Sequence, residues 1–172
     1  MLTNYDFDTQ KFDIFEGMTS ISSIISSIEN GISTRKIIKI LYNSDKKKSK
    51  YNELKFLTSK IDKLGFELVG VSHSVIDELA KGKTHGGIIA ICSKVDINEL
   101  SPVKIISNGF YIVLDGIEDP FNFAYAIRSL YAAGADGVIV PSYRFENAQG
   151  LICKGSAGIS EIMPIFKCDI SK

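Results

Sequence analysis

Two polar side chains, Asn122 and Arg128, occupy the segment LDGIEDPFNFAYAIRSLYAAG (114–134), whose residues are otherwise mostly apolar or small. A guanidinium binds phosphate and stabilises negative charge that develops on an oxygen, and it keeps its proton at physiological pH. Two structural roles are alternatives: Asn122 as a capping or turn residue, and Arg128 as an ion-pair partner of Glu118 or Asp119. Six residues correspond to a rotation of about 120° around a helix, so the two side chains do not share one stripe.

A strand, a turn and a helix are expected to position these side chains. FYIVLDG (110–116) reads as a strand, Asp119 can cap the following helix, Pro120 suits the first helical position, and Gly134 closes the helix. The helix therefore begins at the carboxyl end of a strand, where open α/β sheets bind ligands. No G-x-G-x-x-G or Walker sequence is present, so the pattern does not favour a dinucleotide or P-loop site.

Other catalytic or metal-binding patterns are missing from the sequence. With two histidines and no paired serine or cysteine motif, nucleophile–base catalysis is not indicated. His85, in KTHGGI, is by itself more typical of a turn than of a ligand. The three cysteines form no C-x-x-C pair, so we expect no metal site and a reduced, cytoplasmic protein.

The overall charge gives no argument for a nucleic-acid partner, because 20 Lys and Arg balance 20 Asp and Glu. A local basic cluster between Arg35 and Lys50 is the candidate phosphate-binding patch, and a solvated surface is the alternative. The beginning of the sequence, MLTNYDFDTQ, does not resemble a signal peptide, and no apolar run approaches the ~20 residues of a membrane span. Apolar residues make up 45% of the chain, enough for a folded core.

Helices and strands are expected to alternate along the first half of the chain. Residues 1–18 read as an irregular arm, and residues 19–95 as a small α/β domain. Within it we expect helices over 19–31, 51–65 and 74–82, the last capped by Ser74, and strands over 35–43, 66–72 and 87–93.

The second half reads as a linker, 96–109, broken by Pro102, and a second unit, 110–172. Two further strands are expected around DGVIVP and PIFKCDI, with helical pieces between them. A core of about 65 residues rarely stands alone. We therefore expect this unit to pack on the first, to dimerise, or to belong to something longer.

Three segments together resemble one family. LDGIEDPFNFAYAIRSLYAAGADGVIVP is similar to the first signature motif of the SpoU/TrmH RNA ribose 2′-O-methyltransferases, with matches at Asp119, Pro120, Asn122, Arg128 and Gly134. CKGSAGISEIMPI resembles a later family segment, with matches at Ser156, Ala157, Gly158, Glu161 and Pro164. THGGIIAICS resembles the turn and strand that end the family's N-terminal domain. The resemblance covers most of residues 19–168.

The resemblance implies a ribosomal-protein-like α/β domain that binds RNA, followed by the first half of a parallel-sheet SPOUT domain. It also implies S-adenosylmethionine as cofactor and a homodimer with the active site at the subunit interface. The chain ends before the family motifs that form the trefoil knot and most of the cofactor pocket. We therefore expect a C-terminally truncated member that is inactive alone and binds the cofactor poorly, with cofactor-binding residues unknown.

Asn122 and Arg128 inherit the catalytic role from this resemblance. The residues expected to bind RNA are Arg35, Lys36, Lys47, Lys48, His85, Arg144, Lys154 and Ser156. Ala124 departs from the family pattern, which has glycine there, and the added methyl group is expected to meet a partner or substrate.

The leading hypothesis is an RNA 2′-O-methyltransferase that acts on rRNA or tRNA. The alternatives are a non-catalytic RNA-binding or dimerising remnant, and a nucleotide-binding regulatory domain with its anion at the helix that starts near Pro120.

Overall fold

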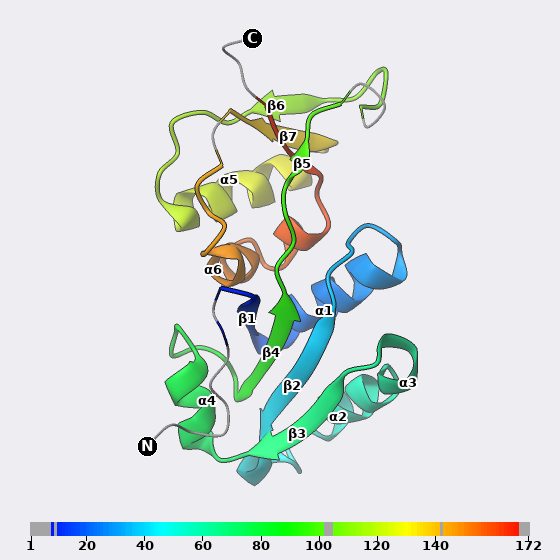
Figure 1. Cartoon of the computed structure of the whole chain (residues 1–172), viewed down its shortest axis with the longest axis vertical. Coiled ribbons are helices and arrows are strands. Elements are labelled where there is room, and N and C mark those ends of the chain that lie inside the picture. Colours follow the sequence, from blue (N-terminus) through cyan, green and yellow to red (C-terminus); the bar gives the residue numbers. More distant parts are fainter. Residues whose placement is uncertain (1–7, 9, 102–104, 142, 169–172) are drawn as a thin grey trace. The chain divides into compact units, whose positions relative to one another are not determined.

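The computed structural model describes residues 8, 10–101, 105–141 and 143–168 of the α/β chain (Figure 1). The chain divides into two compact units. One consists of Met1–Ile21 and Arg35–Lys94, and the other of Ser22–Thr34 and Val95–Lys172. The segment Ser22–Thr34, expected within the first domain, therefore groups with the second unit. No described helix is both long and apolar enough to cross a lipid bilayer.

The first unit contains a mixed four-stranded sheet. Its strands are β1 (Phe12–Glu16), β4 (Ile88–Ser93), β2 (Ile37–Asn43) and β3 (Glu67–Val71), in that spatial order. β4 pairs antiparallel with β1 and β2, whereas β2 and β3 are parallel. Aliphatic side chains from these strands and from helix α4 (His73–Leu79) form a buried cluster that includes Leu41, Val71, Ile76, Ile89 and Ile91.

Strand β1 corrects the prediction of an irregular arm over residues 1–18, of which residues 1–7 and 9 lie outside the described part. Phe15 is fully buried, but its neighbours Asp13 and Glu16 are buried too. The Glu16 carboxylate accepts hydrogen bonds from the backbone N–H groups of Lys81 and Gly82, at 2.6 and 3.0 Å. Glu16 therefore has a structural role, whereas Oδ2 of the buried Asp13 has no hydrogen-bond partner among the described residues and lies 3.8 Å from Nη1 of Arg35.

Asp13 should make the stability of the fold depend on pH. Burial raises the pKa of its carboxyl above the ordinary value of 3.8, against the opposing charges of Arg35, Lys94 and Lys81. The folded state then binds this proton more tightly than the unfolded state, so the free energy of unfolding falls as pH rises from about 4 through the raised pKa.

Urea unfolding between pH 4 and 7 tests this expectation. The D13N variant has no carboxyl to titrate and should gain stability relative to the wild type as the pH rises. A stability difference that stays constant across the range would contradict the assignment to Asp13.

The helices of the described residues in this half are α1 (Gly17–Glu29), α2 (Tyr51–Thr58), α3 (Ile61–Leu64) and α4 (His73–Leu79), with a short 3₁₀ helix η1 (Ser44–Lys46). The expected helix 51–65 is divided, because the hydroxyls of Thr58 and Ser59 donate to the carbonyls of Leu54 and Phe56 near the break. The N-cap of α4 is Ser72, not Ser74 as predicted.

The second unit is built on a parallel sheet, as expected. Its order is β5 (Asn98–Glu99), β8 (Ile165–Lys167), β7 (Gly137–Val140) and β6 (Tyr111–Val113). β5 corrects part of the predicted linker 96–109, because Asn98 and Glu99 pair with β8. Pro102 lies outside the described residues.

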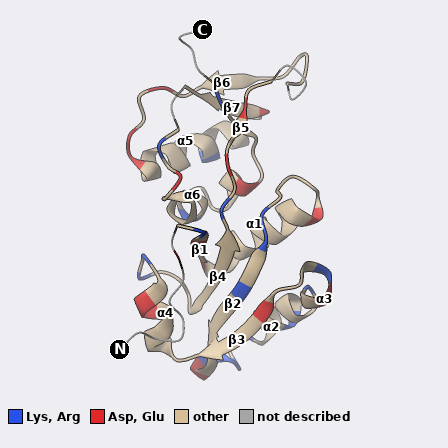
Figure 2. Cartoon of the chain, viewed as in Figure 1, with Lys and Arg blue, Asp and Glu red and all other residues tan. Residues whose placement is uncertain are grey.

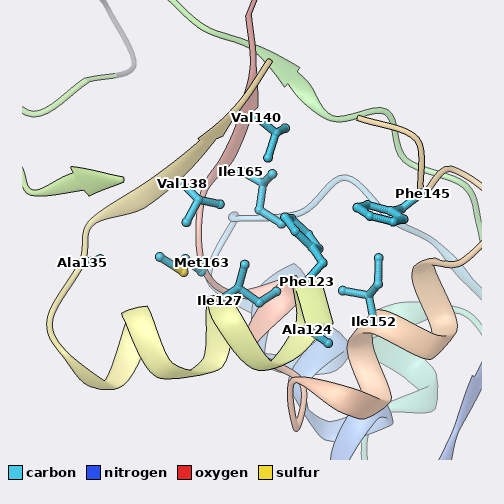
Figure 3. Packing of buried hydrophobic residues seen from close by; sticks show 10 residues of the cluster. All are labelled: Phe123, Ala124, Ile127, Ala135, Val138, Val140, Phe145, Ile152, Met163 and Ile165. Carbon is cyan, nitrogen blue, oxygen red and sulfur yellow. The ribbon is translucent and has the colours of Figure 1, made fainter. Parts of the chain in front are cut away.

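Helices α5 (Pro120–Ala132) and α6 (Gln149–Gly155) and the 3₁₀ helix η3 (Ile159–Glu161) accompany this sheet. Figure 3 shows side chains from α5, β7, α6 and the β8 region meeting in one core. The rings of Phe123 and Phe145 stack at 5.0 Å, and Tyr143 packs edge-on against both. This core fixes which face of α5 is buried.

Candidate active-site helix and basic surfaces

The start of α5 is formed by the residues that the sequence predicted. Asp119 is the N-cap, and its Oδ1 accepts the backbone N–H of Asn122 at 2.8 Å, with Pro120 in the first turn. Because Asp119 performs the capping, Asn122 is not the cap. Its side chain is exposed and forms no hydrogen bond with another described residue.

Arg128 is also exposed, on the same helix. The expected ion pair with Glu118 or Asp119 does not form, and no other described residue pairs with its guanidinium. The six-residue separation places the two side chains about 9 Å apart along the helix axis. Both are therefore available to an external ligand.

Sequence reasoning missed Tyr125, which lies between the two candidates. It is 55% exposed. Helical geometry places it about 60° around the helix from Asn122 and about 60° from Arg128. The signal in the sequence was the spacing, because a tyrosine three residues from each polar candidate lies near both on a helix. The exposed face of α5 therefore combines an amide, a phenol ring and a guanidinium.

Ala124 lies on the opposite, buried face. The sequence predicted that its methyl group meets a partner or substrate. In the structure the methyl group instead packs inside the second unit. A Cβ atom placed on Gly155 of α6 would lie 2.9 Å from the Cβ of Ala124. The alanine that departs from the family pattern is therefore accommodated by the glycine on α6.

The other expected RNA-binding residues of the second unit differ in exposure. Ser156 is fully buried; its Oγ donates to the carbonyl of Cys153 at 3.2 Å and accepts the N–H of Ser160 at 3.1 Å. The structure therefore gives Ser156 a role in joining α6 to η3, which corrects its assignment to RNA. Arg144 is exposed, and Lys154 is half-buried with a partner.

Arg35, expected to bind RNA, is 5% exposed. Its Nη1 donates to the carbonyl of Ser93 at 2.7 Å and lies 3.8 Å from the Asp13 carboxylate, and its guanidinium covers the Phe15 ring at 4.6 Å. These contacts correct the prediction, because no phosphate can reach a guanidinium buried in this way. The nearby Lys36 is exposed.

The exposed lysines of the first unit lie on its loops and on its helices, Lys55 on α2 and Lys63 on α3 among them. Lys47 and Lys48 are exposed, as expected of the basic stretch after β2. Figure 2 shows lysine and arginine positions on both units rather than on one alone. Contact between any of these lysines and RNA stays a prediction.

His85 is a buried structural residue of the loop before β4. It is 4% exposed, its Nδ1 accepts the N–H of Gly87 at 3.1 Å, and its Nε2 lies 2.8 Å from Oδ1 of Asp77. Since Nδ1 is an acceptor, the neutral ring carries its proton on Nε2 and donates it to Asp77. Both ring nitrogens are occupied, which favours the turn interpretation over direct RNA contact.

The carboxyl edge of the second sheet has a small pocket. It is about 230 Å³ in volume and is lined by Glu99, Pro141, Tyr143, Lys167 and Cys168. The Lys167 ammonium pairs with the Glu99 carboxylate at 3.1 Å. Among the described residues, no group of three potential metal ligands is found.

Comparisons with known proteins extend the sequence resemblance. The chain is 32% identical over 117 residues to the 23S rRNA (guanosine-2′-O-)-methyltransferase RlmB of Haemophilus ducreyi, across 64% of this chain and 47% of the relative. The chain spans about half the length of the curated relatives it matches. No protein-family profile matches the sequence.

Solved structures share the fold. The AdoMet-bound rRNA methyltransferase of Sinorhizobium meliloti superposes with a TM-score of 0.68 at 19% identity, over 92% of this chain and 54% of that protein. The SpoU methyltransferase AviRb of Streptomyces viridochromogenes gives 0.68 at 17% identity, over 91% and 55%. The sequence relatives and the solved structures therefore support the resemblance to the SpoU/TrmH methyltransferases that the motif residues of α5 predicted.

Proposed function

We propose that this protein acts in the S-adenosylmethionine-dependent methylation of a ribose 2′-hydroxyl, on a guanosine of 23S rRNA. The observation that carries the proposal is the exposed face of α5. It presents Asn122 and Arg128 in the register of the family motif, and neither side chain is paired with a described residue. The names of the sequence relatives supply the substrate class.

Arg128 is proposed to bind the phosphate beside the target ribose and to stabilise the negative charge that develops on the 2′-oxygen. It is not proposed as the base, because a guanidinium keeps its proton. Asn122, six residues earlier on the same helix, is proposed to hydrogen-bond the nucleotide and fix its position. Alignment of the hydroxyl with the methyl donor would supply most of the rate enhancement.

The methyl donor does not fit the pocket at the carboxyl edge of the second sheet. Its volume of about 230 Å³ lies below the roughly 300–1,000 Å³ of ligand pockets. We therefore derive no step through the donor.

Calorimetry on the 172-residue chain should accordingly show no micromolar binding of S-adenosylmethionine. The measurement should be repeated with rRNA present, because an RNA-bound state could complete a site. Micromolar binding to the free chain would contradict the cofactor part of the proposal.

The remaining parts of the proposal follow the family resemblance. The first unit is proposed to be the ribosomal-protein-like RNA-binding domain, and the protein to be cytoplasmic and homodimeric. Sedimentation equilibrium tests the dimer.

The methylation state of the RNA tests the function itself. Ribose methylation in 23S rRNA should be mapped from cells with and without the gene. Loss of one methylated guanosine supports the proposal. An unchanged map, with RNA binding retained by the purified chain, would favour the non-catalytic RNA-binding alternative.

A further inference from the structure

We propose that a second pocket, in the first unit, binds a phosphate group, and that in the cell this phosphate belongs to the backbone of the RNA substrate. This inference rests on the proposed function for the source of the phosphate, but not for the site. The pocket is about 650 Å³ in volume, large enough for a nucleotide. It is formed by α4, the loop before β4 and the end of η1.

Lysines gather at this pocket from two separate segments. Lys46 comes from η1, and Lys81 and Lys83 from the loop before β4. Within the described residues, the ammonium groups of Lys46 and Lys83 have no carboxylate partner. Three positive charges around one cavity attract a multiply charged anion such as phosphate.

The acidic residue that lines the pocket does not cancel this charge. Asp77 receives a hydrogen bond from Nε2 of His85 at 2.8 Å, and its other oxygen lies 3.6 Å from Nε2 of His73. Both oxygens of the single carboxylate therefore face imidazole rings. The balance of formal charge among the lining residues remains positive.

The wall that carries two of the lysines is held in place before any ligand arrives. Glu16 anchors the start of the loop through the N–H groups of Lys81 and Gly82, and the ring of His85 anchors its end through Gly87. Gly87 has a φ of +75°, and a Cβ there would lie 3.7 Å from Cδ of Lys46. A fixed wall lowers the entropic cost of ordering the site around a phosphate.

The pocket differs from the basic patch that the sequence suggested. Lys47 and Lys48 follow Lys46 directly but do not line the pocket. A matched control comes from Lys55 on α2 and Lys63 on α3, which are exposed and do not line the pocket, because K46M/K83M and K55M/K63M each remove two positive charges from the same unit.

Binding of a 23S rRNA fragment should be measured by fluorescence anisotropy across 50–300 mM KCl. K46M/K83M is expected to lower the affinity about 10-fold at moderate salt and to reduce the slope of log K against log salt by about 1.5, since each lost phosphate contact contributes 0.7–0.9. K55M/K63M should change both quantities much less. Equal losses in the two variants would indicate a diffuse basic surface and overturn the pocket.

Inorganic phosphate and GMP provide an arm that does not depend on RNA. NMR should show saturable shifts of the Gly86 and Gly87 amide signals in the wild type and not in K46M/K83M. Absence of these shifts in the wild type would overturn the phosphate site. If GMP binds but RNA does not displace it, the phosphate site stands and the RNA source is wrong. The methylation map is independent of all these readouts, so failure of the pocket and failure of the proposed function are distinguishable.

Discussion

Replacing Arg128 with alanine is expected to lower ribose methylation of the target RNA by about 10²–10³-fold while leaving the fold intact. The rate falls because a charge that stabilises the developing oxyanion is removed, and single donors of this kind contribute on this scale. The fold is unaffected because Arg128 is exposed and pairs with no described residue. Exposed substitutions of this type change the free energy of unfolding by less than about 0.5 kcal/mol.

Activity is measured as the methylated fraction of the target nucleotide in cells that carry each variant in place of the wild-type gene. Stability is measured by thermal unfolding of each purified protein. R128K separates charge from geometry: it should recover part of the activity, because lysine keeps the charge but loses the planar fork. S129A, at the neighbouring exposed position, is the control and should behave as the wild type. An R128A variant with full methylation would remove Arg128 from the site.

Introducing a methyl group at Gly155 is expected to destabilise the second unit by about 1–3 kcal/mol, the usual cost of overpacking a core. The new Cβ would lie 2.9 Å from the Cβ of Ala124, closer than real Cβ atoms approach. The family pattern has glycine at position 124, where this chain has alanine, and this chain has glycine at position 155. The two helices therefore have room for one methyl group at this contact, and this chain carries it on α5.

The double variant A124G/G155A should accordingly recover most of the stability that G155A loses. A124G alone removes a buried methyl group and places glycine inside a helix, which costs about 1 kcal/mol or more. A126G measures the cost of a helical glycine without this contact. Urea unfolding followed by circular dichroism gives the free energy of unfolding of the wild type and of each variant. Additive effects of the two substitutions, without a coupling energy, would show that the helices do not pack as described.

Local signals predicted the candidate helix well. Asp119, Pro120 and Gly134 act within a few residues of the helix ends, and the structure places the helix between them. The exposure of Asn122 and Arg128 follows from the same periodicity, because Phe123, Ala124 and Ile127 occupy the buried face.

Pairing between distant segments could not be predicted in the same way. β1 reads as acidic and irregular until Arg35 and the loop at Lys81 supply partners for Asp13 and Glu16. β5 has two residues and exists because β8 lies beside it. Strands of this kind carry almost no signal of their own.

Burial distinguishes the side chains of the predicted site that have a structural role from those that can contact a ligand. Arg35, His85 and Ser156 have the chemistry of RNA-binding residues, yet each is buried with hydrogen-bond partners. Their residue types and motif positions are the same whether they hold a loop or contact a substrate. Only the three-dimensional contacts distinguish the two.

The most direct test of the central claim, that α5 carries a ribose-methylation site, is the mass of the target nucleotide. Total 23S rRNA should be digested and analysed by mass spectrometry from a strain lacking the gene, complemented with the wild type or with N122A/R128A. We expect one 2′-O-methylguanosine that is missing in the deletion strain, restored by the wild type and not restored by the double variant. Restoration by N122A/R128A, or a guanosine methylated equally in all strains, would contradict it.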